Sequence, residues 1–280
     1  MEMLWDHTFQ IVALGSGLLG MLSGVLGSFA VLRKESLLGE GVSHSALPGV
    51  VLVFLLTGAR QTEVLLMGAA ISGLLATFLM MAIVKHSKLK FDSALALVMS
   101  VFFGLGMVLL TYAQRIPTAA QAGLSRFIYG QAAALLRRDI HLIMAVGGTI
   151  LLLVCLFWKE FKILSFDPEY AKVIGVSTGW VNVLLSMLIV ATVIVGLQTV
   201  GVVLMSAMLI APAVAARQWT NNLLTMVILS ACFGALSGII GTAFSSSMRG
   251  MPTGPAIVVC ATAITLFSLV FRMYKRGDNV

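Results

Sequence analysis

The sequence predicts an all-α integral membrane protein, a polytopic bundle of about nine spanning helices. Of its 280 residues, 59% are hydrophobic and only 10% are charged, whereas soluble domains carry roughly 25% charged residues. The apolar runs repeatedly reach the length of about 20 residues that a helix needs to cross a bilayer. Spanning β-barrels would show short alternating segments instead. We therefore expect residues 1–280 to form a single transmembrane domain.

Nine apolar runs mark the expected spans, and eight to ten spans fit the pattern, because the second run is interrupted and the seventh is short. In chain order they cover residues 9–31, 38–58, 63–84, 93–112, 139–158, 180–200, 202–216, 222–244 and 255–271. Small residues recur four apart within several runs, and such pairs let helix backbones approach closely in lipid. The pairs are Gly20 and Gly24, Gly68 and Ser72, and Gly234 and Gly238.

Basic residues gather in alternate connections, which sets the expected orientation. With nine alternating spans and a cytoplasmic C-terminus, the clusters at 85–90, 159–172 and 272–276 all lie inside, as the positive-inside rule requires. The N-terminus then lies outside. Arg137 and Arg138 also fall outside, against the rule, in a loop over 113–138 that could hold a re-entrant or interfacial helix. Because the net charge of +7 sits at span ends, we do not expect a nucleic-acid partner.

Glu40 and His44 pair an acid with a histidine at helical spacing inside an expected span. Positions i and i+4 share a helix face, so the carboxylate and an imidazole nitrogen can converge on one ion. Carboxylate oxygen suits Mn²⁺ and imidazole suits Zn²⁺ and Fe²⁺, so the pair fits a divalent first-row metal. Ionisable residues inside membranes are commonly functional. A mutually satisfied polar pair, or one in water at the cytoplasmic mouth, remains the alternative.

The residues around this pair favour a site that releases its ion. Pro48 and Gly49 would loosen or break the helix just beyond, and broken helices frame substrate sites in membrane transporters. Two ligands are too few for a structural zinc cage, which suits conduction, where binding must be weak enough for exit. Ser43 and Ser45 are candidates to orient the imidazole, although a bond to a helix carbonyl is the simpler role for each.

The connection 159–179 predicts a short amphipathic helix on the cytoplasmic face. Ser165 or Asp167 would cap its start and Pro168 would occupy its first turn. Gly175 and Gly179 would close it. Both a plain surface helix and a docking helix for another protein fit this pattern.

Sequence motifs of catalysis are missing. The sequence contains no GxxxxGK[ST] phosphate-binding loop, so we do not expect this chain to hydrolyse ATP by that chemistry. It also lacks HExxH and GxSxG. Cys155, Cys232 and Cys260 lie singly in apolar runs, which is typical of small buried hydrophobic residues. We therefore do not expect an enzyme.

Three stretches resemble the manganese/zinc/iron permeases of ABC importers, the ABC-3 type. They are residues 32–49 (LRKESLLGEGVSHSALPG), 166–175 (FDPEYAKVIG) and 201–213 (GVVLMSAMLIAPA). The stretches keep the order of the family, and the resemblance covers nearly the whole chain. It implies a type II ABC importer permease fold in a bacterial plasma membrane.

The resemblance also implies partners and cargo. Two permeases would work with two cytoplasmic ATP-binding subunits, fed by an extracellular metal-binding lipoprotein. A second copy of this chain is the expected partner permease, and a heterodimer stays open. No cofactor is expected to be held permanently; Mn²⁺ is the first choice as transported ion, and Zn²⁺ or Fe²⁺ the next.

Residue by residue, the ion-coordinating acid and histidine of the family fall on Glu40 and His44. Relatives often have aspartate where this chain has Glu40, which leaves the metal preference open. Because a protonated imidazole cannot bind metal, uptake should fall as the pH drops below about 6.5. The family's contact with its ATPase falls on the helix at about 165–178, at Asp167, Glu169, Ala171 and Gly175.

Two other functional classes are open to a membrane protein with these residues. A secondary, proton-coupled cation transporter would act without an ATPase, and it would normally carry more than one buried carboxylate. An intramembrane metalloenzyme would need three protein ligands and an open position. The spans supply too few acids and histidines for either class.

Overall fold

The computed structural model describes residues 7–58, 61–115, 130, 135–248 and 251–277. The described residues form helices joined by turns, and none of them lies in a strand. The helices are α1 (His7–Leu32), α2 (Leu38–Ser45), α3 (Leu47–Thr57), α4 (Thr62–His86), α5 (Phe91–Gln114), α7 (Arg137–Leu156), α8 (Trp158–Phe166), α9 (Pro168–Val173), α10 (Thr178–Leu197), α11 (Val202–Trp219), α12 (Leu223–Ser247) and α13 (Thr253–Gly277).

Within the described residues, eight segments are long and apolar enough to cross a membrane. They are α1, α2 together with α3, α4, α5, α7, α10, α12 and α13. The predicted seventh span forms α11, which has 18 residues and packs against α1, α12 and α13. The all-α membrane bundle predicted from the sequence is confirmed, and the number of spans lies within the predicted range.

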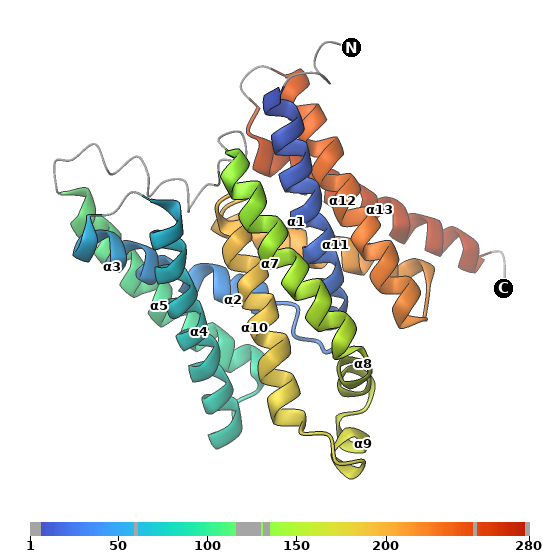
Figure 1. The fold of residues 1–280 in the computed structure, drawn as a ribbon. Coiled ribbons are helices and arrows are strands. Elements are labelled where there is room, and N and C mark those ends of the chain that lie inside the picture. The colour runs from blue at the N-terminus through green and yellow to red at the C-terminus, as the bar shows by residue number, and fades with distance from the viewer. Residues whose placement is uncertain (1–6, 59–60, 116–129, 131–134, 249–250, 278–280) are drawn as a thin grey trace.

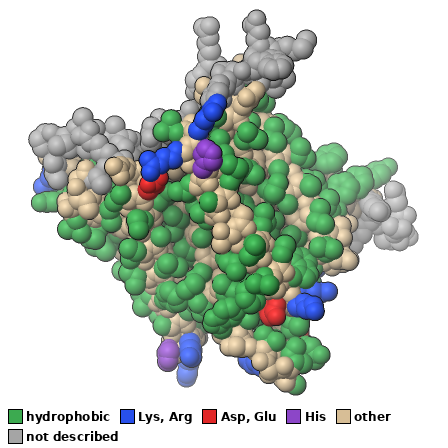
Figure 2. Space-filling view, viewed as in Figure 1, with side chains coloured by type: hydrophobic (Ala, Val, Ile, Leu, Met, Phe, Trp, Pro, Cys, Tyr) green, Lys and Arg blue, Asp and Glu red, His purple; other side chains and the backbone are tan. Residues whose placement is uncertain are grey.

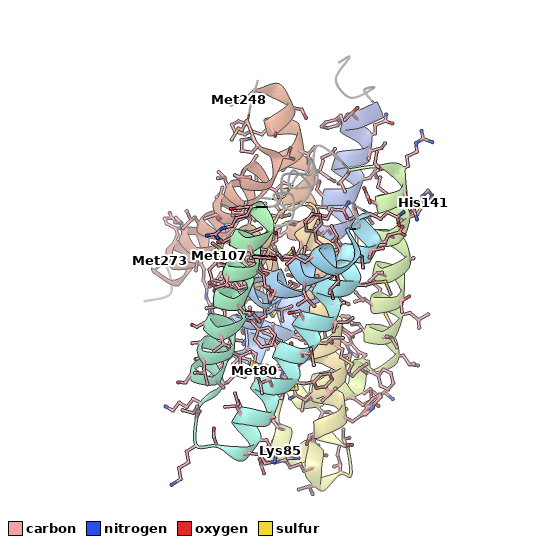
Figure 3. The ribbon with its side chains drawn as sticks, turned by 90° about the vertical axis from the view of Figure 1, so that its left-hand side faces the viewer. Met80, Lys85, Met107, His141, Met248 and Met273 are labelled. Carbon is pink, nitrogen blue, oxygen red and sulfur yellow. The ribbon has the colours of Figure 1, made fainter. Side chains whose placement is uncertain are left out.

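Charged side chains mark the two ends of the bundle. Figure 1 places the start of α1 at the upper end and α9 at the lower end. Lys85 lies at the lower end and His141, near the start of α7, lies toward the upper end (Figure 3). Figure 2 shows lysine and arginine side chains at both ends of a surface that is otherwise mostly hydrophobic. The lysine-bearing turn after α4 and the α8–α9 segment therefore share the end that the sequence predicts to be cytoplasmic.

Glycines bring α1 and α12 into backbone contact. A Cβ atom on Gly20 would overlap the carbonyl group of Gly234, and one on Gly24 would overlap that of Ser230. The Ser230 hydroxyl donates a hydrogen bond to the Gly24 carbonyl at 2.7 Å. Small residues spaced by four thus pack helices closely here, as the sequence predicts.

The cysteines lie elsewhere than the sequence predicts. Cys155 and Cys232 are exposed on the surface of the chain, and Cys260 is half-buried. In a bilayer the outer surface of a helix is apolar as well, so an apolar run does not separate interior from lipid-facing positions.

Candidate metal centre

The second span is broken where the sequence places Pro48. Helix α2 ends at Ser45, Ala46 caps both halves, and Pro48 stands in the first turn of α3. A proline lacks the N–H that would continue the helical hydrogen bonds. The Ser72 hydroxyl on α4 donates to the Ser45 carbonyl at 2.6 Å, which gives that carbonyl a partner at the break.

Helix α2 leaves one narrow face open. Only Glu40 and His44 of its eight residues are not buried; both are half-exposed. The Glu40 carboxylate lies within electrostatic range of the imidazole. The structure therefore brings together the two residues that the sequence singles out, one helical turn apart and facing away from the interior of the chain.

The His44 ring is positioned by an aromatic contact. Its centroid lies 4.9 Å from that of Phe103 on α5, with the ring planes at 87°. Gly106 lets α5 approach this closely, because a Cβ there would press on Leu47 and Pro48. The Nδ1 atom of His44 is buried and has no hydrogen-bond partner among the described residues. The imidazole thus lacks the hydrogen bond that usually fixes a metal-binding histidine.

The two neighbouring serines are buried in α2. The Ser43 hydroxyl is fully buried and donates to the Gly39 carbonyl at 2.7 Å. Ser45 is 1% exposed, and its carbonyl accepts the bond from Ser72. Ser43 therefore has the simpler role that the sequence favours, a bond to a helix carbonyl.

Glu40 and His44 offer two candidate metal ligands on one face of α2. The described part of the chain contains no group of three or more histidine, cysteine, aspartate or glutamate side chains that could hold a metal ion. A metal ion at Glu40 and His44 would need further ligands from water, from backbone or from another chain. Such an arrangement would fit a transient site rather than a structural cage.

Helix α9, at the end that the sequence predicts to be cytoplasmic, is shorter than the predicted 165–178. Asp167 caps it by accepting a hydrogen bond from the Tyr170 N–H at 2.9 Å, while Ser165 bonds within α8 to the Phe161 carbonyl. The chain leaves α9 through Gly175, whose φ of +83° lies in the left-handed region that glycine adopts readily.

The four residues assigned to ATPase contact lie on different sides of α9. Asp167, Glu169 and Gly175 are exposed, and Glu169 pairs with Lys172 at 3.0 Å. Ala171 is fully buried, so it faces the rest of the chain. Sequence reasoning missed an exposed apolar group beside them, formed by Phe166, Tyr170, Val173 and Ile174. The sequence signal that could have revealed this group is the set of large apolar residues in a short connection between two predicted spans.

A buried ion pair at the same end was also missed. The Arg33 guanidinium contacts the Glu35 carboxylate at 2.7 Å and the Asn182 side chain of α10. Burial raises the pKa of Glu35 and lowers that of Arg33, and their mutual attraction opposes both shifts.

Among the described residues, an ion pair lies at the end that the sequence predicts to be outer. Arg138 contacts both carboxylate oxygens of Glu63, at 2.7 Å from Nε and 2.7 Å from Nη2, and so joins the starts of α7 and α4. Most of the predicted loop 113–138, with its expected re-entrant or interfacial helix, lies outside the described residues.

Comparison with known proteins agrees with this architecture. Residues 6–272 match the ABC 3 transport family. The chain is 50% identical over 270 residues to the zinc transport system membrane protein TroC of Treponema pallidum, covering 96% of this chain and 91% of TroC. It is also 50% identical over 280 residues to the manganese transport system membrane protein MntC of Bacillus subtilis, covering 99% of this chain and 64% of MntC.

A solved structure shares the fold. PsaBC from Streptococcus pneumoniae, solved in complex with a Fab, superimposes with a TM-score of 0.81 at 33% sequence identity, over 94% of this chain and 91% of that one. The broken second span, the multi-spanning bundle and the match over nearly the full length lead to one assignment. The chain belongs to the ABC 3 transport family and is a membrane permease of that family.

Proposed function

We propose that this chain conducts divalent transition-metal ions in an ATP-driven importer, and that Glu40 and His44 hold the ion in transit. The observation that carries the proposal is the open face of α2, on which the carboxylate and the imidazole are the two half-exposed side chains. Leaving an acid and a histidine toward lipid would be costly. A passing cation between two chains gives both groups a partner.

The second permease is proposed to be another copy of this chain. One chain supplies one carboxylate and one imidazole on α2, and two copies facing each other would supply two of each. Four mixed oxygen and nitrogen ligands suit Mn²⁺, Zn²⁺ and Fe²⁺. The names of the relatives support both manganese and zinc, and Mn²⁺ remains our first choice, with Zn²⁺ and Fe²⁺ next. Protonation of His44 should weaken uptake in acid.

The energy source is proposed to be a separate cytoplasmic ATP-binding subunit. The sequence lacks a phosphate-binding loop, and α9 presents an exposed apolar group at the predicted cytoplasmic end. Apolar residues that project from a short helix outside the bilayer suit a protein contact. An extracellular metal-binding lipoprotein is proposed to deliver the ion at the opposite end, near the starts of α4 and α7.

Uptake by purified components tests the proposal. Vesicles containing this chain with its ATP-binding subunit, and with the binding lipoprotein added outside, should accumulate radioactive Mn²⁺ or Zn²⁺ only when ATP is enclosed with the ATP-binding subunit. Vesicles with this chain alone should accumulate neither ion. Uptake by the chain alone, driven by a proton gradient, would instead support a secondary transporter.

A further inference from the structure

The turn between α1 and α2 is closed by its own hydrogen bonds. The Glu35 N–H donates to the Ala30 carbonyl at 2.9 Å, and the Leu38 N–H donates to the Glu35 carbonyl at 3.0 Å. Lys34 between them has a φ of +58°, in a region that few side chains adopt. Because this turn runs directly into α2, a displacement of the turn must displace Glu40 as well.

Arg33 fastens this turn to α10. Its Nη2 atom donates to Glu35 Oε1 at 2.7 Å and to Asn182 Oδ1. The side chain of Arg33 is only 9% exposed, and that of Glu35 is 19% exposed. Charge-assisted hydrogen bonds that are shielded from water are among the stronger ones in proteins. The turn before α2 and the beginning of α10 are therefore held together.

The beginning of α10 is in turn tied to α9. The Val176 N–H donates to the carbonyl of the buried Ala171 at 3.0 Å, and the Val181 N–H donates to the Ser177 carbonyl at 3.1 Å. Helix α10 contacts α2, α8 and α9. Figure 1 shows α9 below the lower end of α10, with α2 beside α10 farther up. Movement of α9 thus reaches Asn182 through a short hydrogen-bonded segment.

An open cleft of about 590 Å³ lies beside the Arg33 contact. Its walls come from the turn before α2 and from the segment around α9, and they include Lys34, Glu35, Ser165, Pro168, Thr178 and Asn182. Since the cleft separates these two walls, the Arg33–Asn182 hydrogen bond is a direct polar link across it.

We infer that Arg33 and Asn182 are positioning residues that transmit movement of α9 to α2, and so to Glu40 and His44. The inference rests on the proposed function of α9 and of that pair. When ATP-binding subunits displace α9, the start of α10 and the turn before α2 move together. Helix α2 then tilts about its break at Ala46, which changes access to the ion. Coupling between distant sites is carried by such hydrogen bonds and stiff elements.

A substitution of Asn182 tests the link in the complete importer in vesicles. Asn182→Leu should leave ATP hydrolysis near normal and reduce the Mn²⁺ transported per ATP by about tenfold, within the range that coupling residues produce. Asn182→Asp keeps an oxygen acceptor for Arg33 and should retain the wild-type ratio. Asn221→Leu makes the same change at an exposed position before α12 and is the matched control. An unchanged ratio in Asn182→Leu would overturn the inference.

A distance measurement decides the question even if Asn182→Leu does not assemble. Spin labels at Lys34→Cys and Gly179→Cys, in a variant whose own three cysteines are replaced by serine, report on the two walls. Lys34 is exposed, and a Cβ at Gly179 meets no atom within 4 Å. With Asn182 intact, the label distance should be the same in the nucleotide-free and ATP-bound importer. A distance that differs between these states would mean that the walls move independently, and it would refute the link.

Metal binding separates this inference from the proposed function. Mn²⁺ binding to the resting importer should be lost in Glu40→Gln and retained in Asn182→Leu. If Glu40→Gln binds Mn²⁺ normally, the proposed ion site fails. The transport-to-hydrolysis ratio of Asn182→Leu still reports on the Arg33 link in that case.

Discussion

The rings of Phe103 and His44 meet at 87°, with their centroids 4.9 Å apart. This contact joins α5 to the open face of α2 and restricts the rotation of an imidazole whose Nδ1 atom has no hydrogen-bond partner among the described residues. A neutral phenyl ring takes the place that a carboxylate or a carbonyl usually has behind a metal-binding histidine. Ring packing without such a hydrogen bond holds the imidazole less firmly than both together would, and this would suit the proposed site, from which the ion must leave.

Removing the Phe103 ring should therefore weaken ion binding without abolishing it. Aromatic pairs contribute about 0.5–1.5 kcal/mol beyond area burial, so Phe103→Ala should raise the Mn²⁺ dissociation constant about two- to tenfold. Phe103→Tyr keeps the ring and should bind normally. Leu105→Ala, at a 53% exposed position of the same helix, is the control. Equal losses of Mn²⁺ affinity in Phe103→Ala and Leu105→Ala, measured by titration calorimetry, would argue against a specific role of the Phe103 ring.

Acidity should affect the half-buried pair of Arg33 and Glu35, at the predicted cytoplasmic end, through Glu35. Burial raises the pKa of this carboxyl above its ordinary value of 4.5 despite the nearby Arg33. When the pKa of a group is raised in the folded state, its contribution to stability is fully present at a pH below the ordinary pKa. This contribution is lost as the pH rises through the folded-state pKa. The unfolding temperature of the wild type should therefore fall relative to that of Glu35→Gln as the pH rises from about 4.5. A difference in unfolding temperature between wild type and Glu35→Gln that stays constant across this pH range would contradict the raised pKa of Glu35.

The glycine contact between α1 and α12 should be intolerant of even a methyl group. Gly20→Ala would drive a Cβ into the Gly234 carbonyl group, and overpacking of this kind costs about 1–3 kcal/mol. Gly148→Ala on α7 adds the same methyl group where no atom lies within 4 Å. Thermal unfolding in detergent should show a loss for Gly20→Ala and little change for Gly148→Ala. A larger loss of thermal stability in Gly148→Ala than in Gly20→Ala would contradict the close contact between α1 and α12.

The apolar group on α9 should govern attachment of the ATP-binding subunit. Val173 is 84% exposed, the most exposed of its four members. A charge at the centre of a protein contact costs about 2 kcal/mol or more, so Val173→Asp should weaken copurification of the subunit at least tenfold. Leu89→Asp is the control, because it alters an exposed leucine in another turn at the predicted cytoplasmic end, and it should leave copurification unchanged. Undiminished copurification with Val173→Asp would remove α9 as the docking element.

The bundle could be predicted from the sequence because the bilayer imposes strong rules. Length and apolarity were enough to predict the spans. The orientation, taken from the positions of lysine and arginine, stays a prediction. The break near Pro48 and the role of Asp167 as a cap follow from local chemistry, and the structure contains both. These features depend on residues that are neighbours in the sequence.

Features that join distant segments could not be predicted. The contact of Phe103 with His44 and that of Arg33 with Asn182 depend on how separate helices pack, and no local pattern encodes either pairing. The burial predicted for Cys155 was wrong for a related reason. Lipid-facing and buried positions of a membrane helix are equally apolar, so the sequence does not distinguish them. The burial of Ala171 likewise depends on how α9 folds back against the chain.

Pulsed electron paramagnetic resonance of Mn²⁺ bound to the purified importer tests the central claim most directly. If the ion rests between Glu40 and His44, the spectrum should contain the nitrogen modulation of a coordinated imidazole, and His44→Gln should abolish it. His86→Gln, which alters an exposed histidine at the C-terminal end of α4, should leave the modulation unchanged. A modulation that persists in His44→Gln, or a wild-type spectrum with oxygen ligands alone, would contradict the account.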